Sequence, residues 1–91
     1  MIKFEWDSEK DVSNQKKHGI SFEQASEVFL DDHRITVIDT RFDYDEERLI
    51  TLGAVNNRIY VVAHCEQDEE IIRIISARKA NKKEQKYYAN R

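Results

Sequence analysis

The hydrophobic and polar positions of the second half of the chain alternate along four runs. This period of two predicts four consecutive β-strands. The connections between the runs are short and polar, so neighbouring strands are expected to form antiparallel hairpins. One connection contains Asn56 and Asn57, and asparagine tolerates the positive φ angles of a tight turn. The four runs are residues 34–40, 48–55, 58–65 and 70–78.

The first half of the chain predicts one short strand and then a helix. Residues 2–6 alternate between apolar and polar side chains, which indicates a strand with one buried face. Asp7 or Ser8 can cap the following helix, and Ser8 with Asp11 resembles a capping box. Gly19 is placed to end this helix as a left-handed C-cap. Because the helix is almost entirely polar, it is expected either to pack weakly or to face something other than the core.

Two further helices have capping-box sequences at their starts. Ser21 is followed three residues later by Gln24, and Asn81 is followed in the same way by Glu84. The helix after Ser21 has an apolar stripe at helical spacing and ends within residues 30–33. The predicted order is β-α-α-β-β-β-β-α, which is an α+β fold with a four- to five-stranded antiparallel sheet. The stripe consists of Phe22, Ala25, Ser26, Val28 and Phe29.

Composition limits the kind of protein that this chain can be. With 91 residues it suits a single domain over residues 1–91, and it has no proline and only two glycines, which favours regular structure. Cys65 is the single cysteine, so no internal disulfide can form, and a reduced, cytoplasmic setting is expected. The histidines and the cysteine lack metal-ligand spacing, so neither a metal nor another cofactor is predicted. Neither a membrane span nor a signal peptide is predicted.

The charge is distributed unevenly although the net charge is only −3. Residues 23–47 contain nine acidic residues and two arginines, whereas residues 71–91 contain seven Lys or Arg and one acid, Glu84. This asymmetry indicates a local basic surface near the end of the chain. A run of like charges on an ordinary solvated helix is the alternative.

Four segments occur in an order and spacing that resemble the BrnT family, the toxin half of a type II toxin–antitoxin system. The resemblance implies a fold like that of the RelE/ParE superfamily and a ribonuclease activity that stops translation. It also implies a ribbon-helix-helix antitoxin of the BrnA kind, which binds the toxin and, together with it, the operator DNA. The segments are FEWD (4–7), KKHGISFEQA (16–25), ERLITLG (47–53) and RIISARKANKKEQKYY (73–88).

Metal-independent RNA cleavage needs a base for the 2′-hydroxyl, an acid for the leaving 5′ oxygen and cations for the phosphoryl charge. Arg78 is the first candidate for phosphate contact, because it ends a strand and is expected on the face of Ile72 and Ile74. Arg48 is the second, because it matches the family's ERL segment. The alternatives are a routine charge at the strand end for Arg78 and an ion pair with a neighbouring acid for Arg48.

Lys17 and His18 end the first helix and are candidates for proton transfer, because histidine titrates near neutral pH. The alternative is that these cations only complement the C-terminal end of the helix dipole. Arg73 interrupts an apolar run, so it lies either at a sheet edge or in a substrate site. Candidates for substrate binding on the last helix are Lys82, Lys86 and Tyr88, where the lysines would steer RNA.

Three aromatic residues, His64, Trp6 and Tyr88, could take part in chemistry, but each also has a simpler structural interpretation. His64 lies beside apolar neighbours on one strand, as a satisfied structural histidine does. Trp6 could stack on a base, but it is more simply part of the core. Tyr88 could either dock the last helix on the sheet or place its hydroxyl near Arg78.

The alternative to a ribonuclease is a protein without catalytic activity. It would be a binding module, or a degenerate toxin that acts only as a partner or corepressor.

Overall fold

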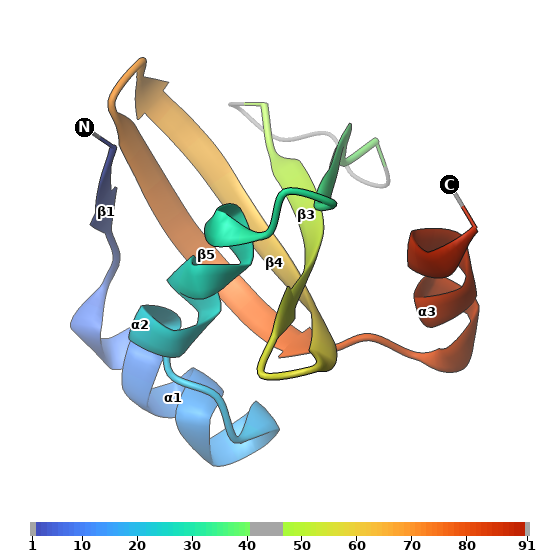
Figure 1. Cartoon of the computed structure of the whole chain (residues 1–91). Helices are drawn as coiled ribbons and strands as arrows, with labels where there is room; N and C mark the ends of the chain where they lie inside the picture. Colours follow the sequence, from blue (N-terminus) through green and yellow to red (C-terminus); the bar gives the residue numbers. More distant parts are fainter. Residues whose placement is uncertain (1, 41–46, 91) are drawn as a thin grey trace.

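The computed structural model describes residues 2–40 and 47–90 and has the predicted order of helices and strands (Figure 1). The α+β class is confirmed. The polar connector predicted at residues 41–47 lies outside the described residues except for Glu47. The elements are β1 (Lys3–Glu5), α1 (Ser8–His18), α2 (Phe22–Ala25), the 3₁₀ helix η1 (Ser26–Leu30), β2 (Ile35–Ile38), β3 (Leu49–Val55), β4 (Arg58–Asp68), β5 (Ile71–Lys79) and α3 (Lys82–Ala89).

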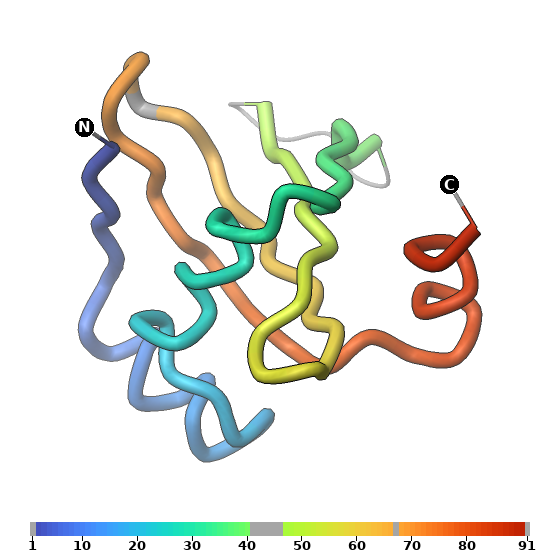
Figure 2. Tube along the Cα trace, viewed as in Figure 1, coloured from blue at the N-terminus to red at the C-terminus, as the bar shows by residue number. Residues whose placement is uncertain are grey.

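The five strands form one sheet in the order β1-β5-β4-β3-β2. Strands β2 to β5 pair antiparallel, as their short connections predict. The turn between β3 and β4 contains Asn56 and Asn57 with φ angles of 50° and 67°, which confirms the predicted tight turn. Strand β1 pairs with β5 in parallel, so the sheet is mixed, and Figure 2 shows the N-terminal segment beside β5. Parallel pairing needs a long connection, and the described part of the chain between β1 and β5 provides it with three helices and three strands.

One face of the sheet, here named the closed face, is covered by α2 and η1. The predicted apolar stripe supplies the cover: Phe22, Ala25 and Val28 are fully buried. Phe4 of β1 and Phe29 of η1 pack at the border of this core, with ring centroids 5.4 Å apart. The helical turn tightens to 3₁₀ after α2. The buried cluster consists of Ile20, Phe22, Ala25, Val28, Val55, Val62, Ile74 and Ala77.

Gly53 allows η1 to lie directly on β3. A Cβ atom at this position would be 2.7 Å from the Cβ of Val28 and 2.9 Å from its carbonyl oxygen. Both distances are shorter than van der Waals contact, so any larger side chain would push η1 away from the sheet. The glycine of the ERLITLG segment therefore has a packing role.

Helix α1 begins at one of the two predicted caps, but without the predicted capping box. Asp7 is its N-cap and accepts hydrogen bonds from the N–H groups of Glu9 and Lys10, so the predicted capping box of Ser8 and Asp11 is wrong. Asn14 is buried although the helix is polar. Its Oδ1 accepts the N–H of Ala77 at 3.1 Å, and its Nδ2 donates to the carbonyl of Ile20 at 3.0 Å. Hydrogen bonds rather than apolar packing thus fix α1 on β5.

Helix α3 lies on the other face of the sheet, apart from the remaining helices (Figure 1). The predicted capping box of Asn81 and Glu84 is present. None of the α3 residues is buried, and Tyr88 is the side chain that packs against the small buried cluster of Leu52, Val61 and Ala80. This face, named the open face, is therefore covered only in part. No helix in residues 2–40 and 47–90 is long and apolar enough to cross a membrane.

Candidate functional site

A β-bulge decides which face of the sheet Arg78 occupies. Ile74 of β5 pairs with His64 of β4, and Arg78 of β5 pairs with Val61 of β4. Between these two pairs the chain advances four positions along β5 but only three along β4. Paired residues share a face of the sheet, and successive residues along a strand alternate between the two faces. The extra residue of the bulge therefore moves Arg78 to the face opposite Ile74. The expectation that Arg78 shares a face with Ile72 and Ile74 is wrong. Arg78 instead points to the open face, beside α3.

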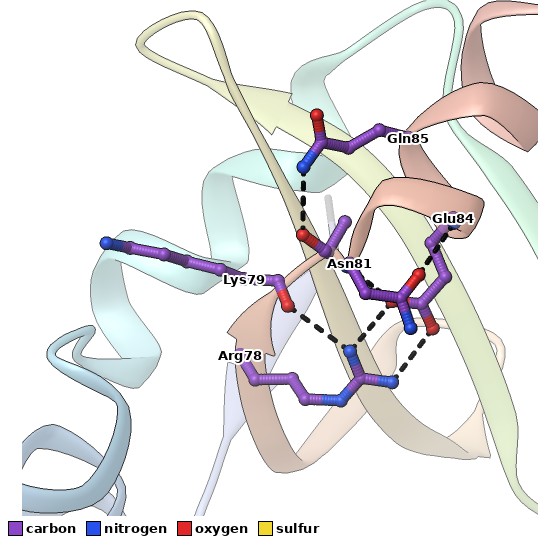
Figure 3. Close-up of polar contacts among 6 residues, drawn as sticks. Arg78, Lys79, Asn81, Glu84 and Gln85 are labelled. Carbon is purple, nitrogen blue, oxygen red and sulfur yellow. Dashed lines mark hydrogen bonds and ion pairs between the residues drawn. The ribbon is translucent and has the colours of Figure 1, made fainter.

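The guanidinium of Arg78 forms a two-pronged ion pair with Glu84 (Figure 3). Nη1 and Nη2 each donate to one carboxylate oxygen of Glu84 at 2.8 Å, and Nη1 also donates to the carbonyl of Lys79 at 3.2 Å. Glu84 accepts the backbone N–H of Asn81 at 2.8 Å as well. The capping residue of α3 therefore also fixes the guanidinium. Both side chains remain partly exposed, at 38% for Arg78 and 26% for Glu84.

A groove of about 410 Å³, here named the α3 groove, lies between α3 and the open face. Its floor is aliphatic, and the first turns of α3 form its wall. Arg78 lies at the junction between floor and wall. The lining residues are Val37, Ile50, Leu52, Val61, Arg78, Lys83, Glu84 and Tyr87.

Asp31 ties α3 to the edge of the sheet. Its Oδ2 accepts the N–H of Ala54 at 2.9 Å and the hydroxyl of Tyr88, and its Oδ1 accepts the N–H of His33 at 2.9 Å. Burial acts to raise the pKa of Asp31, but the hydrogen bonds from Tyr88, Ala54 and His33 outweigh burial and lower it below its ordinary value. The carboxylate therefore stays ionised. Tyr88 docks the helix, which was one of the two roles expected for it.

A second groove, the α1 groove of about 460 Å³, contains Lys17 and His18. It lies between α1 and the bulged part of β5, where Ile75 and Ser76 form one side. Its other lining residues include acids and bases, so its charge is mixed. They are Asp7, Glu9, Lys10, Ser13 and Asn14.

The structure does not bring all candidate catalytic residues into one cleft. Lys17 and His18 line the α1 groove, whereas Arg78 lines the α3 groove. Strand β5 connects the two places, because Ser76 borders the first groove and Arg78, two residues later, borders the second. Any substrate that contacts both groups must cross the end of β5.

The remaining candidates are spread over the sheet and over α3. Arg48 lies directly before β3, half-buried, with its carbonyl accepting the N–H of Asp39 at 2.8 Å. It continues the alternation of the open-face residues of β3 but does not line the α3 groove. Arg73 lies within the sheet, between β1 and β4, and forms an ion pair with Glu5 at 3.5 Å. Lys82 and Lys86 are exposed on α3.

His64 is part of the closed-face core. It is 1% exposed, its ring meets the ring of Phe29 edge-on at 4.9 Å, and its Nε2 forms a 2.8 Å hydrogen bond with the hydroxyl of Thr51. Burial lowers its pKa from the ordinary 6.5 to about 4. The ring is therefore neutral and part of the core, but the predicted satisfied histidine is only half confirmed, because the buried Nδ1 has no hydrogen-bond partner among the described residues. Trp6 packs edge-on against Phe22, with centroids 6.1 Å apart, and is likewise a core residue.

Comparisons with known proteins identify the family of this chain. A family model described as "Ribonuclease toxin, BrnT, of type II toxin-antitoxin system" matches residues 6–84. The chain belongs to this family. The 1.1 Å crystal structure of the Brucella abortus ribonuclease toxin BrnT has 28% sequence identity and a TM-score of 0.68, and the match covers 90% of this chain and 100% of that one. A search of curated proteins finds no match.

In this BrnT-family toxin, sequence reasoning missed the two side chains that hold helices at strand edges. Asn14 accepts the N–H of Ala77, which lies on β5 beyond the residues that pair with β1. Asp31 accepts the N–H of Ala54, which lies on β3 beyond the residues that pair with β2. A buried asparagine in a polar helix and an acid after a helix have no local signal of their partners, which are 63 and 23 residues away. Among the described residues, no group of three His, Cys, Asp or Glu could hold a metal.

Proposed function

We propose that this toxin is a metal-independent endoribonuclease that stops translation by cutting RNA in the cytoplasm. Its antitoxin would be a ribbon-helix-helix protein that neutralises it and, together with it, binds the operator DNA. The match of the ribonuclease toxin model over residues 6–84 is the observation that supports this proposal.

The proposed reaction is attack of a ribose 2′-hydroxyl on the adjacent phosphorus. A base removes the 2′ proton, the bond to the 5′ oxygen breaks, and an acid protonates that oxygen, which leaves a 2′,3′-cyclic phosphate. His18, with Lys17 beside it, is the proposed proton-transfer group. Arg78 and Arg48 are proposed to contact the phosphoryl oxygens, because a guanidinium remains protonated and binds phosphate through two N–H groups.

The position of β5 supports this division of labour. The α1 groove with Lys17 and His18 and the α3 groove with Arg78 border the same end of the strand. An RNA backbone crossing this end would meet the proton-transfer group first and the phosphate-binding group next. Outlying cations would raise the local RNA concentration. Arg73, Lys82 and Lys86 are the proposed contributors, and Tyr88 contributes by holding α3 in place.

Incubation of the purified protein with RNA in EDTA tests the proposal. We expect cleavage to persist in EDTA, to leave cyclic-phosphate ends, and to fall at least about 100-fold in His18→Ala. Val12→Ala is the matched control, because Val12 is exposed on the same helix and outside both grooves. Intact RNA at high protein excess would contradict the proposed activity. Cleavage by His18→Ala at the wild-type rate would contradict only the assignment of His18.

The second candidate is a binding module without catalysis. The bidentate contact of Arg78 with Glu84 favours it, because an arginine already engaged by a carboxylate is an ordinary structural feature. Expression of the chain in cells without its antitoxin distinguishes the two. Growth arrest favours the ribonuclease, and unaffected growth at confirmed expression favours the binding module.

A further inference from the structure

The floor of the α3 groove is an aliphatic surface that the described residues of α3 cover only in part. Leu52 and Val61 are each 6% exposed, and Ile50 packs against them. Val37 extends the floor to the edge strand β2 and is 40% exposed. Helix α3 forms the opposite wall but buries none of its residues. Within residues 2–40 and 47–90, a groove of about 410 Å³ with an aliphatic floor therefore lies beside the helix.

Lys83 supplies a lysine at the rim of this groove, whereas Lys82 and Lys86 lie on the same helix outside its lining. Lys82, Lys83 and Lys86 are exposed on α3, and none of them forms an ion pair within residues 2–40 and 47–90. Glu84 is the single acid of the helix, and its carboxylate is occupied by Arg78 and by the N–H of Asn81. A molecule that binds here gains most if it combines apolar side chains with negative charge.

An acidic amphipathic peptide segment fits this groove better than RNA does. The four aliphatic side chains of the floor offer no hydrogen-bond donor to phosphates or sugars, whereas they match the apolar face of a helix or extended segment. Carboxylates on the other face of that segment would meet Lys83 at the rim. Exposed apolar residues surrounded by polar ones are typical of protein–protein contacts.

We propose that the α3 groove is the surface that binds the antitoxin, through an acidic amphipathic segment of that protein. The proposal rests on the assignment of this chain as the toxin of a toxin–antitoxin pair. Apolar side chains of the segment fill the space between Val37, Leu52 and Tyr87. Its carboxylates pair with Lys83 at the rim. Bound in this way, the antitoxin also covers Arg78, so it blocks the proposed phosphate contact without touching Lys17 or His18.

Two neighbouring residues of β2 provide a matched test. Val37 lies on the open face and lines the groove, whereas Ile38 has its side chain on the opposite face and is 55% exposed. The probe is the protein encoded beside the toxin gene, purified and titrated calorimetrically into Val37→Asp, Tyr87→Asp and Ile38→Asp. We expect Kd to rise at least about tenfold for the first two variants and to stay within about threefold for the third.

Circular dichroism and thermal unfolding of each variant show that it is folded before binding is compared. Equal binding by Val37→Asp, Tyr87→Asp and wild type would overturn the proposal, as would equal weakening by Ile38→Asp or the absence of any binding to wild type. Loss of RNA cleavage in Val37→Asp with unchanged antitoxin binding would assign the groove to RNA instead. A wild-type chain that binds the probe but leaves RNA intact would contradict the ribonuclease proposal and leave this one standing.

Discussion

The two faces of the sheet are covered by helices to different extents. On the closed face, α2 and η1 bury Phe22, Ala25 and Val28 fully against β3, β4 and β5. On the open face, α3 buries none of its own residues and touches a cluster of only three buried side chains. The closed face supplies the stability of this small domain. The open face keeps apolar surface and cations available for a partner.

The attachments of the helices follow the same division. Asn14 holds α1 through two hydrogen bonds in a buried position. Helix α3 is held by polar contacts that are only partly buried, those of Tyr88 with Asp31 and of Arg78 with Glu84. Polar contacts near solvent stabilise less than buried packing does. Local opening is therefore expected to begin at α3.

The largest difference between the faces is expected from truncation of one apolar residue on each. Phe22→Ala removes a fully buried ring from the closed face and should lower the free energy of unfolding by about 3–5 kcal/mol. Val37→Ala, on the open face, should change it by no more than about 0.5 kcal/mol. Urea unfolding measures both. Equal losses would show that the open face contributes as much to stability as the closed face.

The closed face should also make the protein sensitive to acid. Because the pKa of His64 is lowered from 6.5 to about 4, the unfolded chain takes up a proton before the folded one does. Stability should therefore be complete above pH 6.5 and fall by about 3 kcal/mol as the pH decreases to about 4. Urea unfolding across this range measures the loss. His64→Leu should remove most of this slope, and an unchanged slope in the variant would assign it to other groups.

On the open face, two substitutions distinguish the role of Arg78 in RNA cleavage from that of Glu84. Arg78→Ala should reduce RNA cleavage about 100-fold, as removal of a phosphate-stabilising donor does. Glu84→Gln keeps the capping box, since glutamine also serves at this position, but removes the charge that competes with phosphate. Its cleavage rate should equal or exceed that of wild type. If Glu84→Gln lost as much activity as Arg78→Ala with the fold intact, the ion pair itself would be the functional unit.

How far the sequence predicts each face depends on whether the relevant interaction is local. The strands, the Asn56–Asn57 turn and the two capping boxes were predictable, because each depends on residues a few positions apart. The face of Arg78 was not predictable, because isoleucines occur at both odd and even positions of residues 71–75 and give no signal of the bulge that follows. The separation of Arg78 from His18 likewise depends on tertiary packing that no motif encodes.

The Tyr87 and Tyr88 pair gives the smallest expected effect and the sharpest test of how α3 is held. Tyr88→Phe removes the hydrogen bond to Asp31 and should cost about 1–2 kcal/mol, whereas Tyr87→Phe alters an exposed side chain and should cost no more than about 0.5 kcal/mol. Hydrogen exchange separates local from global effects. If α3 opens independently, Tyr88→Phe lowers the protection of its amides about tenfold and leaves β3, β4 and β5 unchanged. Equal loss of protection in the strands would mean that the partly covered open face unfolds only together with the closed core.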